Sequence, residues 1–484
     1  MKRTLAFYSG LFLLLLVLQK ASGAVTKIIL ARSLAPADYG VITLVTLSLP
    51  ALLQVVTNLN FYEMLSHSKE GKEYFGFSVV VSLLLTAAIS LAIWIFREGF
   101  FSYLNIGARE DLLFFSLVFT LLATTLMVDL VGLYTGLKRY TLPGILNAIP
   151  SISKMLLVAV LVLSGSGSFG VLVLAITLTN ALPALYLLVS RKGRQDLGLL
   201  RPIRIPSARI FAFGASLLLV GSFSTIGQSL IRIVISHELG MEWQGYFDVS
   251  LTFGSLILFT VGTMSFISIP EATGCSPDQL GDRGALGDIA RTLLAGTILI
   301  SILLYAYSGA LVPLLFSRSY QPAGDYFPLL IPGYFLLFVL QFHAGVAICL
   351  GRDLRDSLRV ILVPLLCLPL FFFLPLFLIH AYGQGPGGNG FSAAYLSYSA
   401  IVLVCTVGTI LASGTWRPLA ILAEKAGRLI VSSVLAIGVL VILHPGPVIG
   451  IPLITILFGA AIFGTRYVSP GMIREIFQRG GDEA

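Results

Sequence analysis

Long apolar stretches alternate with short polar segments along almost the whole chain. Each stretch is close to the roughly 20 apolar residues that one helix needs to cross a bilayer. Charged residues, glycine and proline separate neighbouring stretches. The pattern predicts an all-α polytopic membrane protein with about fourteen transmembrane helices, near residues 7–31, 40–61, 76–96, 112–135, 145–163, 170–190, 210–235, 246–268, 292–316, 326–350, 357–380, 391–412, 427–443 and 447–466.

Composition supports a chain that lives within a bilayer. The 484 residues are 57% hydrophobic and 11% charged, whereas soluble domains carry about 25% charged residues. The net charge of +8 does not indicate nucleic acid, because the basic residues are spread between the apolar stretches and form no single basic face. We therefore exclude nucleic acid as a partner and expect membrane lipids instead. The first stretch also resembles a signal peptide in outline, but we assign it as a transmembrane span because it is the first member of the repeat described below.

The basic residues predict which side of the membrane each loop faces. When the N-terminus, every even-numbered loop and the C-terminus are assigned to one side, that side collects 23 of the 31 Lys and Arg residues. Cytoplasmic loops are enriched in these residues, so we expect a multi-pass protein of the cytoplasmic membrane with both termini in the cytoplasm. The loop at 191–209 carries six of the charges. It is interpreted as a topology anchor, with binding of anionic lipid head groups as the alternative.

A weak internal repeat relates the two halves of the chain. At an offset of 205 residues, residues 26–34 fall on 231–239 and residues 39–42 fall on 244–247 without a gap. An offset of six spans preserves orientation, which predicts two parallel, pseudo-twofold-related lobes of six helices around a central cavity. The predicted domains are an N-lobe at 1–205, a C-lobe at 206–413, and two additional helices with a cytoplasmic tail at 414–484.

Several short words resemble a known family. Residues 31–40, Ala-Arg-Ser-Leu-Ala-Pro-Ala-Asp-Tyr-Gly, resemble the signature of polysaccharide-exporting flippases, which are O-antigen-type transporters in the superfamily that also contains the multidrug and toxin extruders. Residues 133–139, 211–214 and 244–247 are similar to further parts of that pattern. One departure is Ile231, which stands where the family often has Asp before the basic residue of the seventh span.

The resemblance implies a function as well as a fold. It implies a polysaccharide-biosynthesis flippase that moves a polyprenyl-phosphate-linked oligosaccharide from the cytoplasmic to the outer leaflet by alternating access, without changing a covalent bond. We accordingly expect a monomer, no enzymatic activity, no catalytic residues and no cofactor. A cation-coupled multidrug exporter of the same superfamily is the alternative, and a membrane glycosyltransferase or glycan polymerase is the third possibility.

Ionisable residues inside the predicted spans are the candidate functional groups, because burying charge in a membrane is costly. The four cations Lys20, Lys27, Lys154 and Arg232 are candidates for binding substrate in the cavity. A positive interior suits an anionic cargo such as a phosphate linkage. Asp129 and Asp248 are the candidates for coupling transport to H⁺ or Na⁺.

Each of these assignments has an alternative. Lys27 and Arg232 coincide at the 205-residue offset and are hypothesised to grip one phosphate, although both are close enough to the outer helix ends to snorkel into water. Asp129 and Lys154 are at similar depths on consecutive spans, which favours an ion pair. Asp248 has no evident partner, so it is either an ion site or an outer-end carboxylate in water. Lys20 is expected to face the cavity.

No metal or nucleotide site is expected from the motifs. The five histidines form no HExxH, and the four cysteines have no metal-ligand spacing. The Gly-rich segment at 165–170 has the GxGxxG spacing but joins two predicted spans, without the strand that a dinucleotide site requires.

Overall fold

The computed structural model describes residues 2–57, 74–107, 109–136, 141–183, 185, 205, 208–272, 284–350, 354–383, 389–465 and 467. Every regular element in these ranges is a helix, and they contain no β-strand. The predicted all-α fold class is therefore confirmed. The predicted basic loop at 191–209 and the tail after residue 467 lie largely outside the described residues.

Ten helices or helical runs among the described residues are long and apolar enough to cross a membrane. They are Pro36–Thr57, Phe75–Ile95, Glu110–Tyr134, Leu142–Leu163, Ala290–Leu315, Arg318–Ala347, Leu358–Tyr382, Asn389–Ser413, Ala426–Leu443 and Pro447–Gly464. Three further helices, α1 (Lys2–Ser33), α12 (Ala208–Glu238) and α13 (Met241–Ala272), have 31 or 32 residues. At 1.5 Å per residue each exceeds the roughly 30 Å of a hydrocarbon core. The chain is a multi-pass membrane protein, and the total of fourteen spans stays a prediction.

Two tight turns follow from local sequence. The turn between α1 and α2 (Pro36–Thr43) has two residues, and Pro36 opens α2 after extended Ala35. Proline suits this position because its missing N–H has no partner there anyway. The turn between α12 and α13 also has two residues, and its Gly240 has a φ of +94°, which glycine adopts without steric cost. The chain thus forms two helical hairpins, α1–α2 and α12–α13, at positions related by the repeat.

Several spans are broken within the membrane segment. The second predicted span is α2, a π-helical turn η1 (Leu44–Ser48) and α3 (Leu49–Thr57). The tenth, predicted at 326–350, contains η5 (Phe327–Leu330) and α16 (Ile331–Leu350), and it is preceded by η4 (Arg318–Tyr320) and α15 (Gln321–Tyr326) in the same apolar run. The eleventh is divided into α17 (Leu354–Cys367) and α18 (Leu370–Tyr382), with Pro369 between them. Such π-turns and prolines interrupt the regular backbone hydrogen bonds of a helix.

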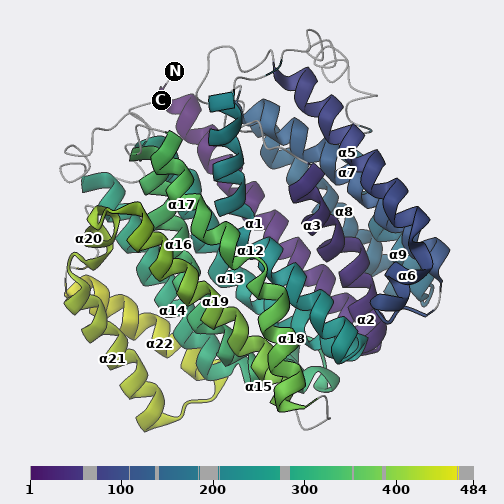
Figure 1. The fold of residues 1–484 in the computed structure, drawn as a ribbon. Helices are drawn as coiled ribbons and strands as arrows, with labels where there is room; N and C mark the ends of the chain where they lie inside the picture. The colour runs from purple at the N-terminus through teal and green to yellow at the C-terminus, as the bar shows by residue number, and fades with distance from the viewer. Residues whose placement is uncertain are drawn as a thin grey trace. The chain divides into compact units, whose positions relative to one another are not determined.

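Two compact units make up the chain, essentially residues 3–248 and 249–484. The first unit also contains α5 (Phe75–Ile95), α6 (Arg97–Tyr103), α7 (Glu110–Gly136), α8 (Thr141–Leu163) and α9 (Phe169–Thr179). Within it, α5 and α7 lie side by side (Figure 1). Apolar side chains of α5, α7 and α8 form one buried cluster: Phe75, Val79, Leu130, Leu133, Tyr134 and Leu146, with Tyr74 directly before it in the chain also buried.

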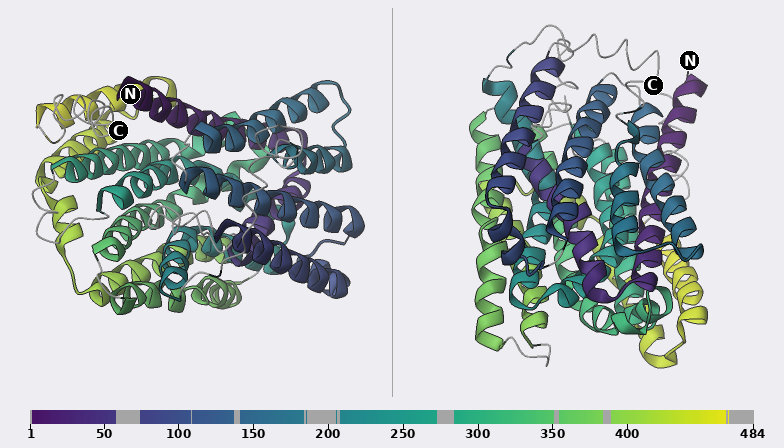
Figure 2. Two further views of the ribbon diagram at one scale, coloured as in Figure 1. Left: turned by 90° about the horizontal axis from the view of Figure 1, so that it is seen from above. Right: turned by 90° about the vertical axis from the view of Figure 1, so that its right-hand side faces the viewer.

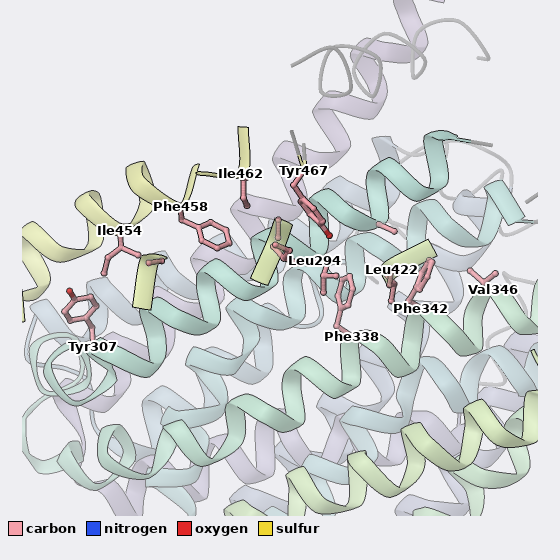
Figure 3. Packing of buried hydrophobic residues seen from close by; sticks show 14 residues of the cluster. Leu294, Tyr307, Phe338, Phe342, Val346, Leu422, Ile454, Phe458, Ile462 and Tyr467 are labelled. Atoms are coloured by element: carbon pink, nitrogen blue, oxygen red, sulfur yellow. The ribbon is translucent and has the colours of Figure 1, made fainter. Parts of the chain in front are cut away.

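The second unit contains α14 (Gly284–Leu315), α19 (Asn389–Ser413), α20 (Arg417–Ala423), α21 (Ala426–Leu443) and α22 (Pro447–Gly464) in addition to η4 and α15–α18. The last two helices form a hairpin, drawn in yellow in Figure 2. Figure 3 shows Phe458 and Ile462 of α22 in one buried cluster with residues of α14 and α16. The Tyr307 hydroxyl also donates to the carbonyl of Pro445, at 3.1 Å. The predicted division at 205 and 413 stays a prediction.

Candidate functional site

Lys27 of α1 and Arg232 of α12 bind the same carboxylate, Asp248 of α13. The Lys27 Nζ lies 3.0 Å from Asp248 Oδ2, and an Arg232 Nη2 lies 2.5 Å from Asp248 Oδ1. The two cations that coincide at the repeat offset therefore meet at one anionic group. Three separate helices supply the three charges, and all three residues belong to the first unit.

The fourth member of this ionic cluster is Tyr39 of α2. Its hydroxyl donates to Asp248 Oδ2 at 2.9 Å, so that Oδ2 accepts from both Tyr39 and Lys27. The Asp248 side chain is completely buried. The prediction that Asp248 has no partner, or is an outer-end carboxylate in water, is therefore wrong. A buried carboxylate is tolerated only when it is paired and hydrogen-bonded, and here two cations and one hydroxyl do this.

The charged ends of Lys27 and Arg232 point inward rather than to water. Their side chains are 19% and 11% exposed, and each contacts the buried Asp248. The snorkelling alternative is therefore wrong for both residues. Two cations and one carboxylate leave the three side chains with one net positive charge. Arg232 also has a buried Nε with no hydrogen-bond partner among the described groups, so the cluster has donor capacity beyond what Asp248 uses.

A close backbone contact lies within the same two hairpins. A Cβ added to Gly40 would lie 2.3 Å from the carbonyl oxygen of Met241. A Cβ added to Gly245 would lie 2.3 Å from the carbonyl oxygen of Pro36. No side chain fits at either position without moving backbone. The contact is reciprocal, as at a two-fold axis, and the two glycines are the pair that the 205-residue offset aligns.

The C-terminal end of α12 is held by the turn after α6. The Asn105 side-chain amide donates to the carbonyls of Ser236 and His237, at 2.8 and 2.7 Å. These are carbonyls of the last turn of a helix, which have no partner within the helix itself. The His237 ring also stacks on Tyr103, with ring centroids 4.1 Å apart. This capping fixes the helix that carries Arg232.

The other candidate residues do not contact Asp248, although Lys20 is close enough to Lys27 for their charges to interact. Lys20 is exposed although it lies inside a predicted span, and Lys154 is partly buried. Asp129 is only 7% exposed and accepts a hydrogen bond from Ser78, at 3.1 Å. No ion pair joins Asp129 to Lys154 in the described residues, so this predicted pair is wrong. Similar depth on neighbouring helices does not specify the direction in which each side chain points.

Two contributors to the site are not predicted from the sequence. Tyr39 lies within the family-like segment 31–40, and the signal for its role is that a buried tyrosine hydroxyl generally needs a partner. Asn105 has a positive φ of 57° and is followed by Ile106 and Gly107, a turn-like composition that marks the position without revealing its role as a cap.

Comparison with known proteins places this fold. The lipid II flippase MurJ in an inward closed conformation is similar over 94% of this chain and 99% of its own, with a TM-score of 0.61 and 10% identity. The Vibrio cholerae MATE transporter VcmN is similar over 85% and 97%, with a TM-score of 0.54 and 14% identity. An inward-facing MATE-family multidrug resistance transporter of the MOP superfamily covers 84% and 96%, with a TM-score of 0.52 and 14% identity.

Sequence comparison identifies the family. A search of curated proteins found no match. The model of the family described as polysaccharide biosynthesis protein matches residues 29–325, which is more than half of the chain and contains Arg232, Asp248 and both close-contact glycines. The chain therefore belongs to the polysaccharide biosynthesis protein family, and it has the fold seen in solved transporters of the MOP superfamily.

Proposed function

We propose that this protein is a flippase for a polyprenyl-phosphate-linked oligosaccharide, which it moves from the cytoplasmic to the outer leaflet during assembly of a cell-surface glycan. The family description supports a role in polysaccharide biosynthesis. The similarity in fold supports a carrier rather than an enzyme. In this proposal the protein lies in the cytoplasmic membrane with both termini in the cytoplasm, acts as a monomer and breaks no covalent bond.

The observation that carries the proposal is the difference in accessibility between acids and bases inside the predicted spans. Asp129 and Asp248 are buried, at 7% and 0% exposure. Lys20 is exposed, and the Lys27 side chain keeps 19% exposure. In this proposal the exposed faces of Lys20 and Lys27 line the path of the cargo, which then meets cations before it meets acids. Such an arrangement favours an anionic head group, which a phosphate or diphosphate linkage supplies.

Lys27, Arg232 and Lys20 are the proposed phosphate-binding residues. Lys20 and Lys27 are seven residues apart on α1 and so share one face of the helix. The Asp248 carboxylate holds Lys27 and Arg232 close together before cargo arrives, because two cations alone would repel each other. A phosphate then binds the positive end of the cluster through donors that Asp248 does not use, such as Arg232 Nε. Lys154 is the fourth proposed substrate-binding cation, and it is not a member of the ionic cluster.

A flipping assay tests this proposal directly. The purified protein is reconstituted in liposomes with a fluorescent polyprenyl-diphosphate oligosaccharide, and an added glycosidase reports how much sugar faces outward. We expect Lys27→Ala and Arg232→Ala each to abolish flipping. Arg318→Ala is the matched control, because Arg318 is an exposed cation outside the cluster. If both cluster variants flip the lipid at the wild-type rate, the phosphate-binding role is refuted.

The same liposomes separate the proposal from the multidrug alternative. A drug exporter moves a cationic dye, and it needs an acid that the dye can reach. In this chain both acidic candidates are buried, so we expect no dye transport. Transport of the dye in the absence of lipid flipping would reverse the assignment. Complementation of a flippase-deficient strain provides the corresponding test in cells.

A further inference from the structure

The interface between α5 and α7 contains polar groups that the ionic cluster does not use. Ser78, Ser82, Thr86 and Ser90 recur every four residues and therefore follow one face of α5. We call them the hydroxyl ladder. At 1.5 Å per residue the ladder extends about 18 Å along the helix. Asp129 of α7 contacts its first member, Ser78, at 3.1 Å.

Most of this polar material has no protein partner. Among the described residues, no group makes a hydrogen bond of good geometry to the buried Oδ2 of Asp129 or to the hydroxyls of Ser82, Thr86 and Ser90, although the Ser82 hydroxyl lies close enough to the Asp129 carboxylate to interact with it. Asp129 is 93% buried, and Ser82 is completely buried. Unsatisfied buried polar groups are rare in folded proteins and require an explanation.

Several other membrane hydroxyls of this chain are satisfied within their own helix, although Thr120, Ser301 and Thr409 also have no partner among the described groups. Thr46, Thr124 and Thr177 each donate to the carbonyl four residues earlier in their helix, at 2.7 to 2.8 Å. This back-bonding is the ordinary way for Ser and Thr to satisfy themselves in a helix. The hydroxyls of Ser82, Thr86 and Ser90 make no such bond. Their capacity to donate and accept is therefore open to a mobile ligand.

The surroundings of Asp129 select the ligand. The apolar cluster of Phe75, Leu130, Leu133 and Tyr134 packs at the same interface. Among the helices packed on α7, the described residues of α3, α5, α9 and η1 include no ionisable side chain. The α8 helix contributes only Lys154, which forms no ion pair with Asp129, and α6 contributes Arg97 and Glu98 at the far end of α7. Within the part of the chain that the structure describes, no fixed charge balances an ionised Asp129, which favours a ligand that neutralises it.

We propose that Asp129 is a proton-binding site and that the hydroxyl ladder is the polar path by which protons reach it. Successive hydroxyls are about 6 Å apart along the helix, so in this proposal water molecules that enter between them carry the proton from one to the next. The carboxylate takes the proton on its open Oδ2 and becomes a neutral acid, and it returns the proton by the same route. In the predicted topology Ser78 lies near the cytoplasmic end of α5 and Ser90 near its outer end. The ladder thus connects Asp129 with the outer side. This assignment does not depend on which cargo the protein carries.

Infrared difference spectroscopy tests the site without any substrate. The full-length protein in lipid is titrated with pH, and the band of a protonated carboxylic acid is followed. We expect a band that appears on acidification and is lost in Asp129→Asn. Asp111→Asn is the control, because Asp111 lies on the same helix and its side chain is 75% exposed. Asp129→Glu keeps the acid and is expected to move the band, which guards against loss of folding in the Asn variant.

Three results would overturn the proposal. The first is an unchanged acid band in Asp129→Asn. The second is a band that responds to Na⁺ at constant pH rather than to pH, which would make the site a sodium site. The third result concerns the path. After a pH jump, we expect the band to form more slowly in the double variant Ser82→Ala, Thr86→Val than in wild type. Thr124→Val is its control, since that hydroxyl back-bonds, and equal rates in both variants would exclude the ladder as the path.

Discussion

The α1–α2 and α12–α13 hairpins have the same construction but carry different charges. Both turn in two residues, and Gly40 and Gly245 make the same close contact with the opposite hairpin. Lys27 and Arg232 take equivalent positions. At the position where α13 has Asp248, however, α2 has Thr43. Thr43 is completely buried, and its hydroxyl donates to the carbonyl of Gly40 in its own helix.

This difference shows where the repeat stops being symmetric. The backbone contacts need two glycines and are kept in both hairpins. The carboxylate is present once and serves the cations of both hairpins. A second acid would cancel the net positive charge that an anionic ligand requires, so a single Asp both assembles the site and leaves it cationic. Four experiments test this comparison.

The largest effect is expected from removing the shared carboxylate. Asp248→Asn leaves two buried cations without their counter-ion, which we expect to cost about 3–5 kcal/mol of stability. Thermal unfolding in detergent measures the loss, with Asp111→Asn as the exposed control. Adding Lys27→Met to Asp248→Asn should restore part of the stability. A single variant as stable as the control would show that the pairing is unimportant.

The glycine contact comes next. Gly40→Ala and Gly245→Ala each place a Cβ 2.3 Å from a backbone oxygen, so the helices must separate at a cost of about 1–3 kcal/mol. The same assay should give similar losses for the two variants, as the reciprocal contact requires. Gly438→Ala is the control, because its Cβ would meet nothing within 4 Å. Losses as small as that of the control would contradict the close approach.

Making the hairpins alike is expected to affect binding more than folding. Thr43→Asp adds a second acid at the position that the repeat aligns with Asp248, and this acid offsets the net positive charge of the two hairpins. We expect the affinity for a polyprenyl diphosphate to fall about tenfold or more, which is roughly 1.4 kcal/mol. In the control Thr43→Asn, the new side chain has the shape of Asp without its charge, and we expect this variant to bind the polyprenyl diphosphate almost as well as wild type. Equal binding by the two variants would show that the net charge of the cluster does not contribute to recognition of the cargo.

The smallest effect concerns the second aligned pair, Tyr39 and Gln244. Tyr39→Phe removes one hydrogen bond to Asp248, which we expect to cost about 1.5 kcal/mol, the low end for a bond to a charged group, because Oδ2 keeps its bond from Lys27. Gln244 is buried, and neither of its amide atoms has a partner among the described groups. Gln244→Leu should therefore be neutral or stabilising in the same unfolding assay. A larger loss for Gln244→Leu than for Tyr39→Phe would reverse this assignment.

The positions of the helices are well predicted by hydrophobic pattern alone. The predicted spans at 76–96, 112–135 and 391–412 agree within a few residues with α5, α7 and α19. Long apolar stretches bounded by charges leave little freedom, since a membrane helix must satisfy its own backbone. The family was also predicted correctly from short words such as residues 31–40.

The contacts of the candidate site were harder to predict. The meeting of Lys27 and Arg232 was inferred from the repeat, but Asp248 was not placed between them, because three helices must first pack for its surroundings to exist. The predicted Asp129–Lys154 ion pair is wrong for the same reason, because the depth of a residue in the membrane does not determine the rotation of its helix about its own axis. The four-residue spacing of the hydroxyl ladder is visible in the sequence. Uncharged hydroxyls are common in membrane helices, however, and only the structure shows that these have no hydrogen-bond partner.

The contact between Lys27 and Asp248 also concerns how the protein is made. The two residues are 221 positions apart, and a chain grows at about 5–20 residues per second. On the ribosome, the ammonium group of Lys27 therefore waits roughly 10 to 45 s before its carboxylate has been synthesised. During that time the first helix cannot take its final place with its charge paired. Its completion has to follow the arrival of α12 and the first turns of α13, so the end of the first unit at residue 248 also marks a step in biogenesis.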